Sequence, residues 1–239
     1  MIWRSLIFSS VSFSVAALPA LCASLSGTVV LRDSHVDAVN RKKDYSGVVI
    51  YARAVGVQSP GVSVHATMLQ KNKTFTPHIL PVETGTTVDF PNADPIFHNA
   101  FSSYNGRIFD VGLYPPGDSR SVRMTQAGIV RVFCNIHSTM SAIIMVVNTP
   151  YFVKTAMNGS FELNVPPGEY DIGVFHERAS ELELSGLGRR VVVTETGLQI
   201  PPITISEAGY LLAPHKNKYG HDYPPSQNED SVFYPGVRN

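Results

Sequence analysis

The chain has 239 residues, of which 44% are apolar and 16% are charged. This length and composition allow one large or two small domains with buried cores. Lysine and arginine together number 19, and aspartate and glutamate together also number 19, so the formal net charge is zero. Because the chain has no excess of basic residues to attract phosphate groups, we expect no nucleic-acid partner.

Residues 1–23 are typical of a secretory signal peptide, with a basic residue near the start, an apolar stretch and Ala23 as a small residue for cleavage. Lipid attachment at Cys22 is the weaker alternative, because Leu21 stands where that processing requires a small side chain. No other stretch approaches the roughly 20 apolar residues that cross a bilayer. We therefore expect a periplasmic or secreted protein that begins near Ser24 and has no transmembrane segment after cleavage.

The rest of the chain has the pattern of an all-β protein. Short β-branched or alternating runs predict strands over 27–31, 47–51, 62–66, 87–90, 130–133, 143–147, 161–163 and 190–193. Turn-forming pairs such as Asn105-Gly106 and Asn158-Gly159 separate these runs. Since no stretch has a sustained helical period, the pattern predicts a β-sandwich or barrel.

Cys134 is the most informative residue. If Cys22 leaves with the signal peptide, the exported protein keeps one thiol that has no internal partner. A buried, inert core cysteine is the simplest interpretation of such a residue. Cys134 stands between two predicted strands, however, and is followed by His137 and Met140. A thiolate, an imidazole and a thioether in one tight loop form a soft ligand set, which favours copper.

A second imidazole is available 36 residues before Cys134, at His98. It follows the predicted strand over 87–90 and has apolar neighbours on both sides. Such neighbours shield an imidazole from water and hold it rigidly, which suits a metal ion that changes its charge. By analogy with other metal sites, we expect the side-chain amide of Asn99 to tie the His98 segment to the Cys134 loop.

Four motifs in this part of the chain resemble the cupredoxin family: Phe90-Pro91-Asn92, His98-Asn99, Phe109-Asp110-Val111-Gly112 and Cys134-Asn135-Ile136-His137. The Cys-x-x-His-x-x-Met loop is similar to the short ligand loop of amicyanin. The motifs together resemble exported bacterial proteins described as plastocyanin-like or methylamine-utilisation-like. The resemblance covers 61–149 and implies a Greek-key sandwich that holds one type 1 copper ion. It implies four copper ligands and one outer residue, which are His98, Cys134, His137, Met140 and, outside them, Asn99.

The same resemblance implies that the copper ion carries one electron between redox partners. The expected partner is another haem or copper protein, which approaches the ring edge of His137. One departure is Ser138, where relatives often have proline, and this difference puts the rigidity of the loop in doubt. A copper-binding module for storage, delivery or sensing is an alternative, and so is an interaction protein with a vestigial cupredoxin. An enzyme is not expected, because nothing indicates a second copper site or a substrate pocket.

A second module is predicted around residues 158–174, where a strand, a Pro-Pro-Gly turn and another strand resemble the carboxypeptidase-regulatory-like (transthyretin-like) β-sandwich. Such a sandwich needs two earlier strands, and the runs near residues 27–31 and 47–51 are candidates. We therefore expect a discontinuous sandwich of 24–59 and 150–206 into which the cupredoxin is inserted. The alternative is a continuous second domain, with 24–59 as an elaboration of the cupredoxin.

Six further histidines have no partner at metal spacing and are expected at the surface or in sheets: His35, His65, His78, His176, His215 and His221. Glu177, Glu181 and Glu183 lie near His176 but fit no metal motif, so a solvated loop is expected there. Residues 207–239 are polar and aperiodic, which predicts an extended tail or a partner-binding strap.

Overall fold

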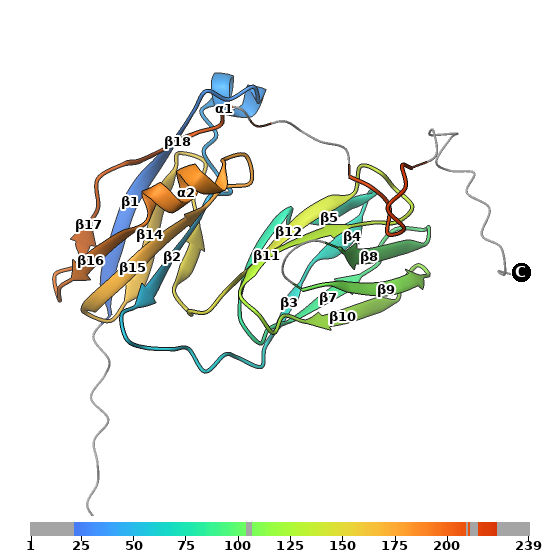
Figure 1. Ribbon diagram of the computed structural model, residues 1–239, viewed down its shortest axis with the longest axis horizontal. Helices are drawn as coiled ribbons and strands as arrows, with labels where there is room; N and C mark the ends of the chain where they lie inside the picture. Colours follow the sequence, from blue (N-terminus) through green and yellow to red (C-terminus); the bar gives the residue numbers. More distant parts are fainter. Residues whose placement is uncertain (1–21, 104–106, 209, 211–214, 224–239) are drawn as a thin grey trace, which may run out of the picture.

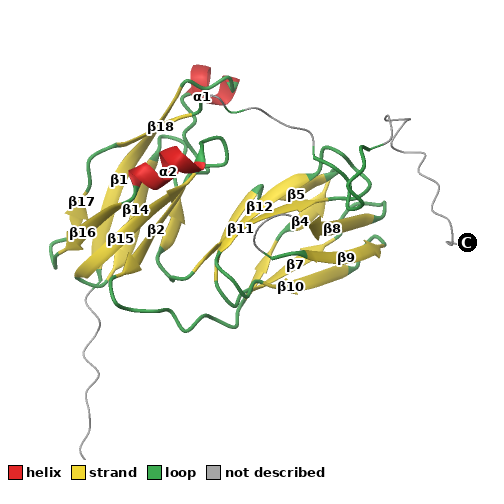
Figure 2. Cartoon of the chain, in the orientation of Figure 1, coloured by secondary structure: helices red, strands yellow, loops and turns green. Residues whose placement is uncertain are grey.

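The computed structural model describes residues 22–103, 107–208, 210 and 215–223. The predicted signal peptide, 1–23, lies outside these residues apart from its last two. Figure 2 shows that strands dominate the molecule, so the expected all-β fold is confirmed. Within the described part of the chain, no helix is long and apolar enough to cross a membrane.

One group of strands comes from both ends of the described chain, and we call it the flanking sandwich. Its first sheet contains β1 (Ala23–Arg32), β14 (Ser160–Val165), β17 (Leu198–Gln199) and β18 (Ile203–Ser206). Its second sheet has the order β13 (Phe152–Lys154), β2 (Val49–Ala54), β15 (Gly168–Phe175) and β16 (Arg189–Val193). Figure 1 shows the two sheets packed against each other.

Strand β1 hydrogen-bonds to segments that are far away in the sequence. It pairs antiparallel with β14, where Leu25 faces Leu163, and parallel with β17 and β18. Strand β2 pairs antiparallel with β13 and with β15. Strands from the two ends of the chain therefore share both sheets. The division into a domain of 61–149 inserted in a discontinuous domain of 24–59 and 150–206 stays a prediction.

The alternating sequence of β1 explains the core of the flanking sandwich. Leu25, Val29 and Leu31 are buried, and the residues between them are partly exposed. Gly27 lies on the same inward face, where a Cβ atom would come within 2.7 Å of the Phe161 ring. The strand is thus one-sided, as period-two patterning requires.

Two short helices accompany this sandwich, although the sequence pattern predicted none. They are α1 (Asp37–Lys42) and α2 (Glu181–Leu187). Helix α2 packs on β15, and α1 lies at the end of the strands in Figure 1. Each is too short to display a helical period in the sequence. The hydroxyl of Ser180 caps α2 by accepting a hydrogen bond from the Glu183 N–H at 3.2 Å.

The strands between β2 and β13 form a second body, which we call the central sandwich. One sheet has the order β10 (Ser119–Arg123), β7 (Thr87–Pro91) and β3 (His65–Thr67). The other has the order β6 (Ile79–Glu83), β12 (Ser141–Val147), β11 (Gly128–Phe133), β8 (His98–Ser102) and β9 (Phe109–Tyr114). The hairpin of β4 (Leu69–Lys71) and β5 (Thr74–Thr76) completes it. Its apolar core contains Cys134 and Met140.

An apolar cluster and a charged pair join the two sandwiches. Val49 and Phe175 of the flanking sandwich pack in one cluster with Ile143 of the central sandwich. Beside this cluster, His78 Nε2 lies 2.7 Å from a carboxylate oxygen of Glu177. The hydrogen bond that His78 donates to the Glu177 carboxylate raises the pKa of His78, although burial opposes it.

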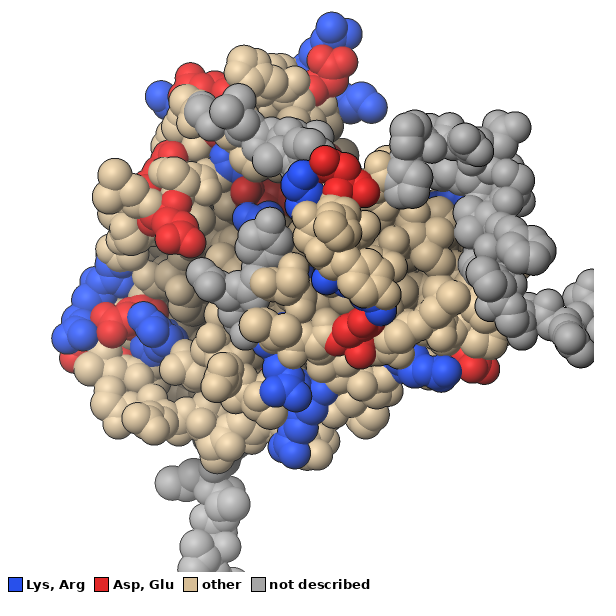
Figure 3. Space-filling view, turned by 45° about the vertical axis from the view of Figure 1, so that its right-hand side comes forward, with Lys and Arg blue, Asp and Glu red and all other residues tan. Residues whose placement is uncertain are grey.

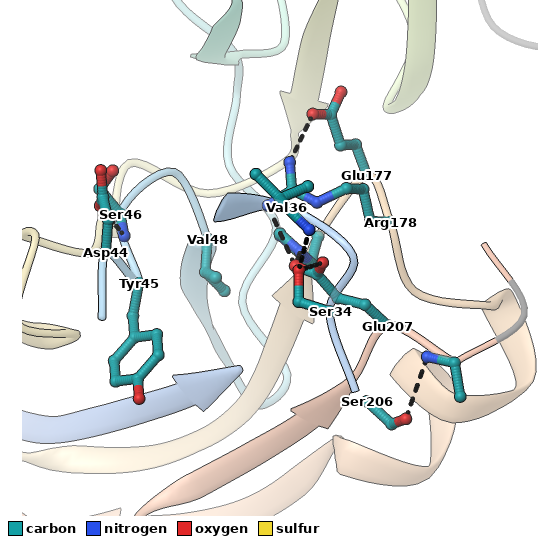
Figure 4. A network of polar contacts seen from close by, with 12 residues as sticks. Ser34, Val36, Asp44, Tyr45, Ser46, Val48, Glu177, Arg178, Ser206 and Glu207 are labelled. Carbon is teal, nitrogen blue, oxygen red and sulfur yellow. Dashed lines mark hydrogen bonds and ion pairs between the residues drawn. The ribbon is translucent and has the colours of Figure 1, made fainter. Parts of the chain in front are cut away.

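The segment after β15 is part of a buried polar network, so the solvated loop expected at Glu177 is wrong, and His176 lies neither at the surface nor in a strand, as had been expected. His176 is 2% exposed, and its Nε2 lies 2.7 Å from the buried carboxylate of Glu207. Glu207 also accepts a hydrogen bond from Ser34 at 2.5 Å and pairs with Arg178 at 3.0 Å. Figure 4 shows Ser34, Arg178 and Glu177 around Glu207. The polar side chains are buried because a distant carboxylate satisfies them.

Candidate metal centre

The segment that carries Cys134 is a closed loop between two paired strands. Strand β11 ends at Phe133 and β12 begins at Ser141, and these two residues face each other in the antiparallel ladder. The register therefore brings Cys134 and Met140 together at the mouth of the loop. The Cys134 N–H donates to the Met140 carbonyl at 3.2 Å, and the Met140 N–H donates to the His137 carbonyl at 3.1 Å.

His98 reaches this loop because β8 is the other neighbour of β11. Phe133 faces Phe101 in that antiparallel ladder, so the start of β8 lies beside the loop that follows β11. The Cys134 sulfur lies 3.9 Å from Nδ1 of His98 and 3.6 Å from Nδ1 of His137. Within the described ranges, His98, Cys134 and His137 form the only group of three histidine, cysteine or acidic side chains whose potential ligand atoms all lie within 4.8 Å of one another.

The centre is closed to solvent. His98, Cys134 and Met140 are 0% exposed, and His137 is 1% exposed. The resemblance implied that the ring edge of His137 lies near the surface, but this side chain does not itself form the surface.

Burial sets the charge state of the thiol. It raises the pKa of the Cys134 thiol, while main-chain N–H groups of Ile136, His137 and Asn99 that hydrogen-bond to the sulfur act in the opposite direction. Three N–H donors around one sulfur stabilise a thiolate once a cation compensates for the burial of its charge.

Asp94 orients the His98 ring, and the sequence analysis missed it. Its Oδ2 atom lies 2.7 Å from Nε2 of His98. Because a carboxylate accepts hydrogen bonds, the ring proton is held on Nε2, and the lone pair of Nδ1 faces the Cys134 sulfur. Burial lowers the pKa of His98 more than Asp94 raises it, so the ring is neutral and competent to bind a metal. An acidic residue four positions before the histidine, in an apolar stretch, was the available clue.

The Asn99 side chain does not reach the Cys134 loop as expected. Its amide nitrogen donates to Asp110 Oδ1 at 2.7 Å and to the Gly112 carbonyl at 2.9 Å, both on β9. The main-chain N–H of Asn99, rather than its side chain, faces the Cys134 sulfur. The reason is the alternation of a strand, because successive side chains of β8 point to opposite faces and His98 occupies the face toward the loop.

Residues 215–223, which we call the strap, lie over the ligand loop; Figure 1 shows them in red at this end of the central sandwich. The Tyr223 hydroxyl donates to the Cys134 carbonyl at 2.6 Å. The Lys218 N–H donates to the Asn135 side chain at 3.0 Å, and the His215 ring stacks on Phe133 with centroids 4.1 Å apart. This described part of the predicted tail is therefore packed, and the His215 side chain is partly buried.

The donor set fits one soft metal ion. Typical bonds from a metal ion are about 2.3 Å to a thiolate sulfur and about 2.0–2.1 Å to an imidazole nitrogen. With an angle of about 120° between these bonds, the sulfur and the nitrogen lie about 3.8 Å apart. The observed distances from Cys134 Sγ to the two Nδ1 atoms, 3.6 and 3.9 Å, bracket this separation. Two imidazoles and one thiolate, with Met140 buried in the same core, are the donors that favour copper.

The comparisons with solved structures give partial matches. A copper-containing nitrite reductase from Thermus scotoductus SA-01 is 24% identical, with a TM-score of 0.35, and the match covers 41% of this chain and 26% of that chain. A purple cupredoxin from Nitrosopumilus maritimus is 22% identical, with a TM-score of 0.31, over 34% of this chain and 99% of that chain. A reduced amicyanin variant is 16% identical, with a TM-score of 0.34, over 41% of this chain and 99% of that chain.

No protein-family model matches the chain, and no curated protein sequence is significantly similar. The chain spans about a quarter of the nitrite reductase, 26%, so the activity of that whole enzyme does not transfer. The assignment of function rests on the geometry of the metal centre itself.

Proposed function

We propose that this protein is an exported one-electron carrier that binds a single type 1 copper ion through His98, Cys134, His137 and Met140. One observation carries the proposal. A buried sulfur lies 3.6 and 3.9 Å from two imidazole Nδ1 atoms that come from different segments of the chain. We propose a role in electron transfer and none in catalysis for these four buried side chains.

The residues of the chain would keep the centre rigid through a change of charge. Asp94 holds the His98 ring, and the paired strands β11 and β12 hold both ends of the loop. Burial excludes water from all four side chains. When bound, copper would supply the reversible change between Cu(I) and Cu(II), and fixed ligands keep the reorganisation for that change small.

The proposed partner is another haem or copper protein in the periplasm or outside the cell. Its docking would depend on shape and on apolar contacts as well as on charge. Support comes from Figure 3, where acidic and basic side chains are interspersed over the described residues of the face shown. The zero formal net charge agrees with a partner that is not selected by a strong overall field.

The deciding experiment is a visible and EPR spectrum of the protein loaded with Cu(II). We expect an intense thiolate-to-copper band and a small parallel hyperfine coupling, and we expect Cys134→Ser to abolish the band. Cys22→Ser, made in the chain that retains residue 22, is the matched control and should leave the band intact. A band that survives Cys134→Ser would refute the ligand assignment.

Two other results would point to the alternatives. Tight copper binding with only a weak Cu(II) band would contradict electron transfer and favour a module for copper storage, delivery or sensing. Copper affinity that is equal in the wild type and in Cys134→Ser would indicate an interaction protein whose ligands have lost their role.

A further inference from the structure

A buried carboxylate lies next to the candidate centre and receives three hydrogen bonds. Asp94 is 6% exposed. Its Oδ1 accepts from the Asn72 N–H at 2.6 Å, and its Oδ2 accepts from the Lys73 N–H at 2.8 Å and from His98 Nε2 at 2.7 Å. The carboxylate therefore connects the metal-facing ring to the main chain of another element.

The hairpin of β4 and β5 is shaped to hold this carboxylate. Asn72 and Lys73 at its tip have φ values of 55° and 54°, in the left-handed region. This conformation turns two successive N–H groups toward the same point, which makes a small anion-binding concavity. The side chain of Asn92 fixes the other side, since it accepts from the Asp94 N–H at 3.0 Å and donates to the Ile96 carbonyl at 2.8 Å.

A negative charge in this position affects both states of the proposed centre. A carboxylate that accepts a hydrogen bond from the Nε2–H group makes the imidazole a stronger electron donor to a metal through Nδ1, as outer hydrogen bonds do in other metal sites. A buried negative charge also favours whichever metal state carries more positive charge. Both effects act on Cu(II) more than on Cu(I).

We infer that Asp94 is a positioning residue that fixes the orientation of His98 and biases the centre toward its oxidised state. The inference rests on the proposed function, because it concerns the balance between Cu(II) and Cu(I) at the same four ligands. It adds a fifth side chain, outside the ligand set, that sets this balance.

The flanking sandwich offers a matched pair that has no metal ligand nearby. His176 Nε2 lies 2.7 Å from Glu207, and both side chains are 2% exposed. Replacement of Glu207 by Gln therefore removes a buried carboxylate from a histidine in the same way as replacement of Asp94 by Asn. The comparison separates an effect on copper from a general loss of stability.

The test measures the affinities for Cu(I) and Cu(II) in the full chain, with copper alone as the probe. We expect Asp94→Asn to raise the ratio of Cu(I) to Cu(II) affinity about tenfold, the lower end of the usual effect of such partners. A tenfold change equals an increase of about 59 mV in the potential of a one-electron couple. Glu207→Gln should leave the ratio within threefold of the wild type. A ratio within threefold in Asp94→Asn, or an equal change in both variants, would overturn the inference.

A second measurement needs neither copper nor a folded variant. Long-range ¹⁵N–¹H spectra of the metal-free wild type should show the His98 ring protonated on Nε2 and unprotonated on Nδ1. The Nδ1–H tautomer would overturn the role of Asp94. If the Nε2–H tautomer is found but the Cu(II)-loaded protein shows no intense band, the proposed electron-transfer function fails, whereas the orienting role of Asp94 stands.

Discussion

The hold of the strap on the ligand loop can be tested by removing one hydroxyl group. The Tyr223 hydroxyl donates to the Cys134 carbonyl at 2.6 Å, across 89 positions of sequence. The variant Tyr223→Phe removes this hydrogen bond and keeps the ring. It also keeps the other contacts of the strap, which are the Lys218 hydrogen bond to Asn135 and the stacking of His215 on Phe133.

The expected effect of Tyr223→Phe on opening of the strap follows from the loss of that one hydrogen bond. A typical intramolecular hydrogen bond contributes a net stabilisation of about 0.5–1.5 kcal/mol, which is roughly a 2- to 13-fold change in an equilibrium constant. If the strap opens locally, without unfolding of the sandwiches, its open population should rise by this factor in the variant. The paired ammonium of Lys218 adds little, because its 2.7 Å contact with Asp110 is partly exposed and screened by solvent.

Trypsin measures the open population, because Lys216 and Lys218 lie within the strap. When opening is fast relative to cleavage, the rate of cleavage follows the equilibrium between open and closed states. We expect Tyr223→Phe to speed cleavage after these two lysines by roughly 2- to 13-fold, as read by mass spectrometry.

The matched control is Tyr170→Phe, which removes a hydroxyl that donates to the Pro166 carbonyl at 2.7 Å in the flanking sandwich. It should leave cleavage of the strap unchanged. Equal cleavage rates in the wild type and Tyr223→Phe, or equal acceleration in both variants, would refute the idea that this hydroxyl closes the strap.

Two further predictions concern the ligand set and the junction between the sandwiches. Met140→Gln should lower the reduction potential while copper stays bound, because an amide oxygen would stabilise Cu(II) more than a thioether does, and Met124→Leu, in the same core, should not change it. At the junction, the raised pKa of His78 gives a stabilisation that is fully present below its ordinary value of 6.5 and lost as the pH rises through the folded-state pKa. Burial raises the pKa of Glu177, but the hydrogen bond to His78 and the nearby charges of His78, Arg178 and His176 together outweigh it, so the pKa is lowered. The stabilisation from Glu177 is therefore present above 4.5 and lost as the pH falls through the lowered pKa. Thermal unfolding of Glu177→Gln should therefore show its largest loss relative to the wild type between about pH 4.5 and 6.5, and a loss independent of pH from 5 to 9 would contradict the pair.

Local sequence patterns were enough to predict the fold class and to nominate the ligands. The alternation along β1 indicated a one-sided strand, and the structure shows it with one buried face. Cys134, His137 and Met140 could be nominated because a short loop between two strands keeps its side chains together whatever the surrounding architecture. His98 could be nominated because it follows a strand in an apolar segment.

Local patterns say less about the residues that support these ligands. The position of Asp94, four residues before His98, was a local clue, but the hairpin tip that holds its carboxylate lies about 22 positions earlier, and no local pattern relates the two. His176 was expected at the surface or in a sheet, and Glu207 at the start of a polar, extended tail, yet each is buried because it satisfies the other across 31 positions. Sequence composition reports on single residues, whereas burial of a polar group depends on a partner supplied by tertiary structure.

The strap bears on the one departure from the family pattern. A proline after His137 would restrict the ligand loop through its own backbone, but this chain has Ser138. Here the loop is restrained from outside, because Tyr223 binds the Cys134 carbonyl and Lys218 binds the Asn135 side chain. Lys218 also binds Asp110, which in turn holds the amide of Asn99 beside His98. The strap thus restrains the Cys134 loop directly and is linked to the His98 strand only through Asp110 and Asn99, so tertiary contacts can restrain the ligand loop in place of a stiff residue.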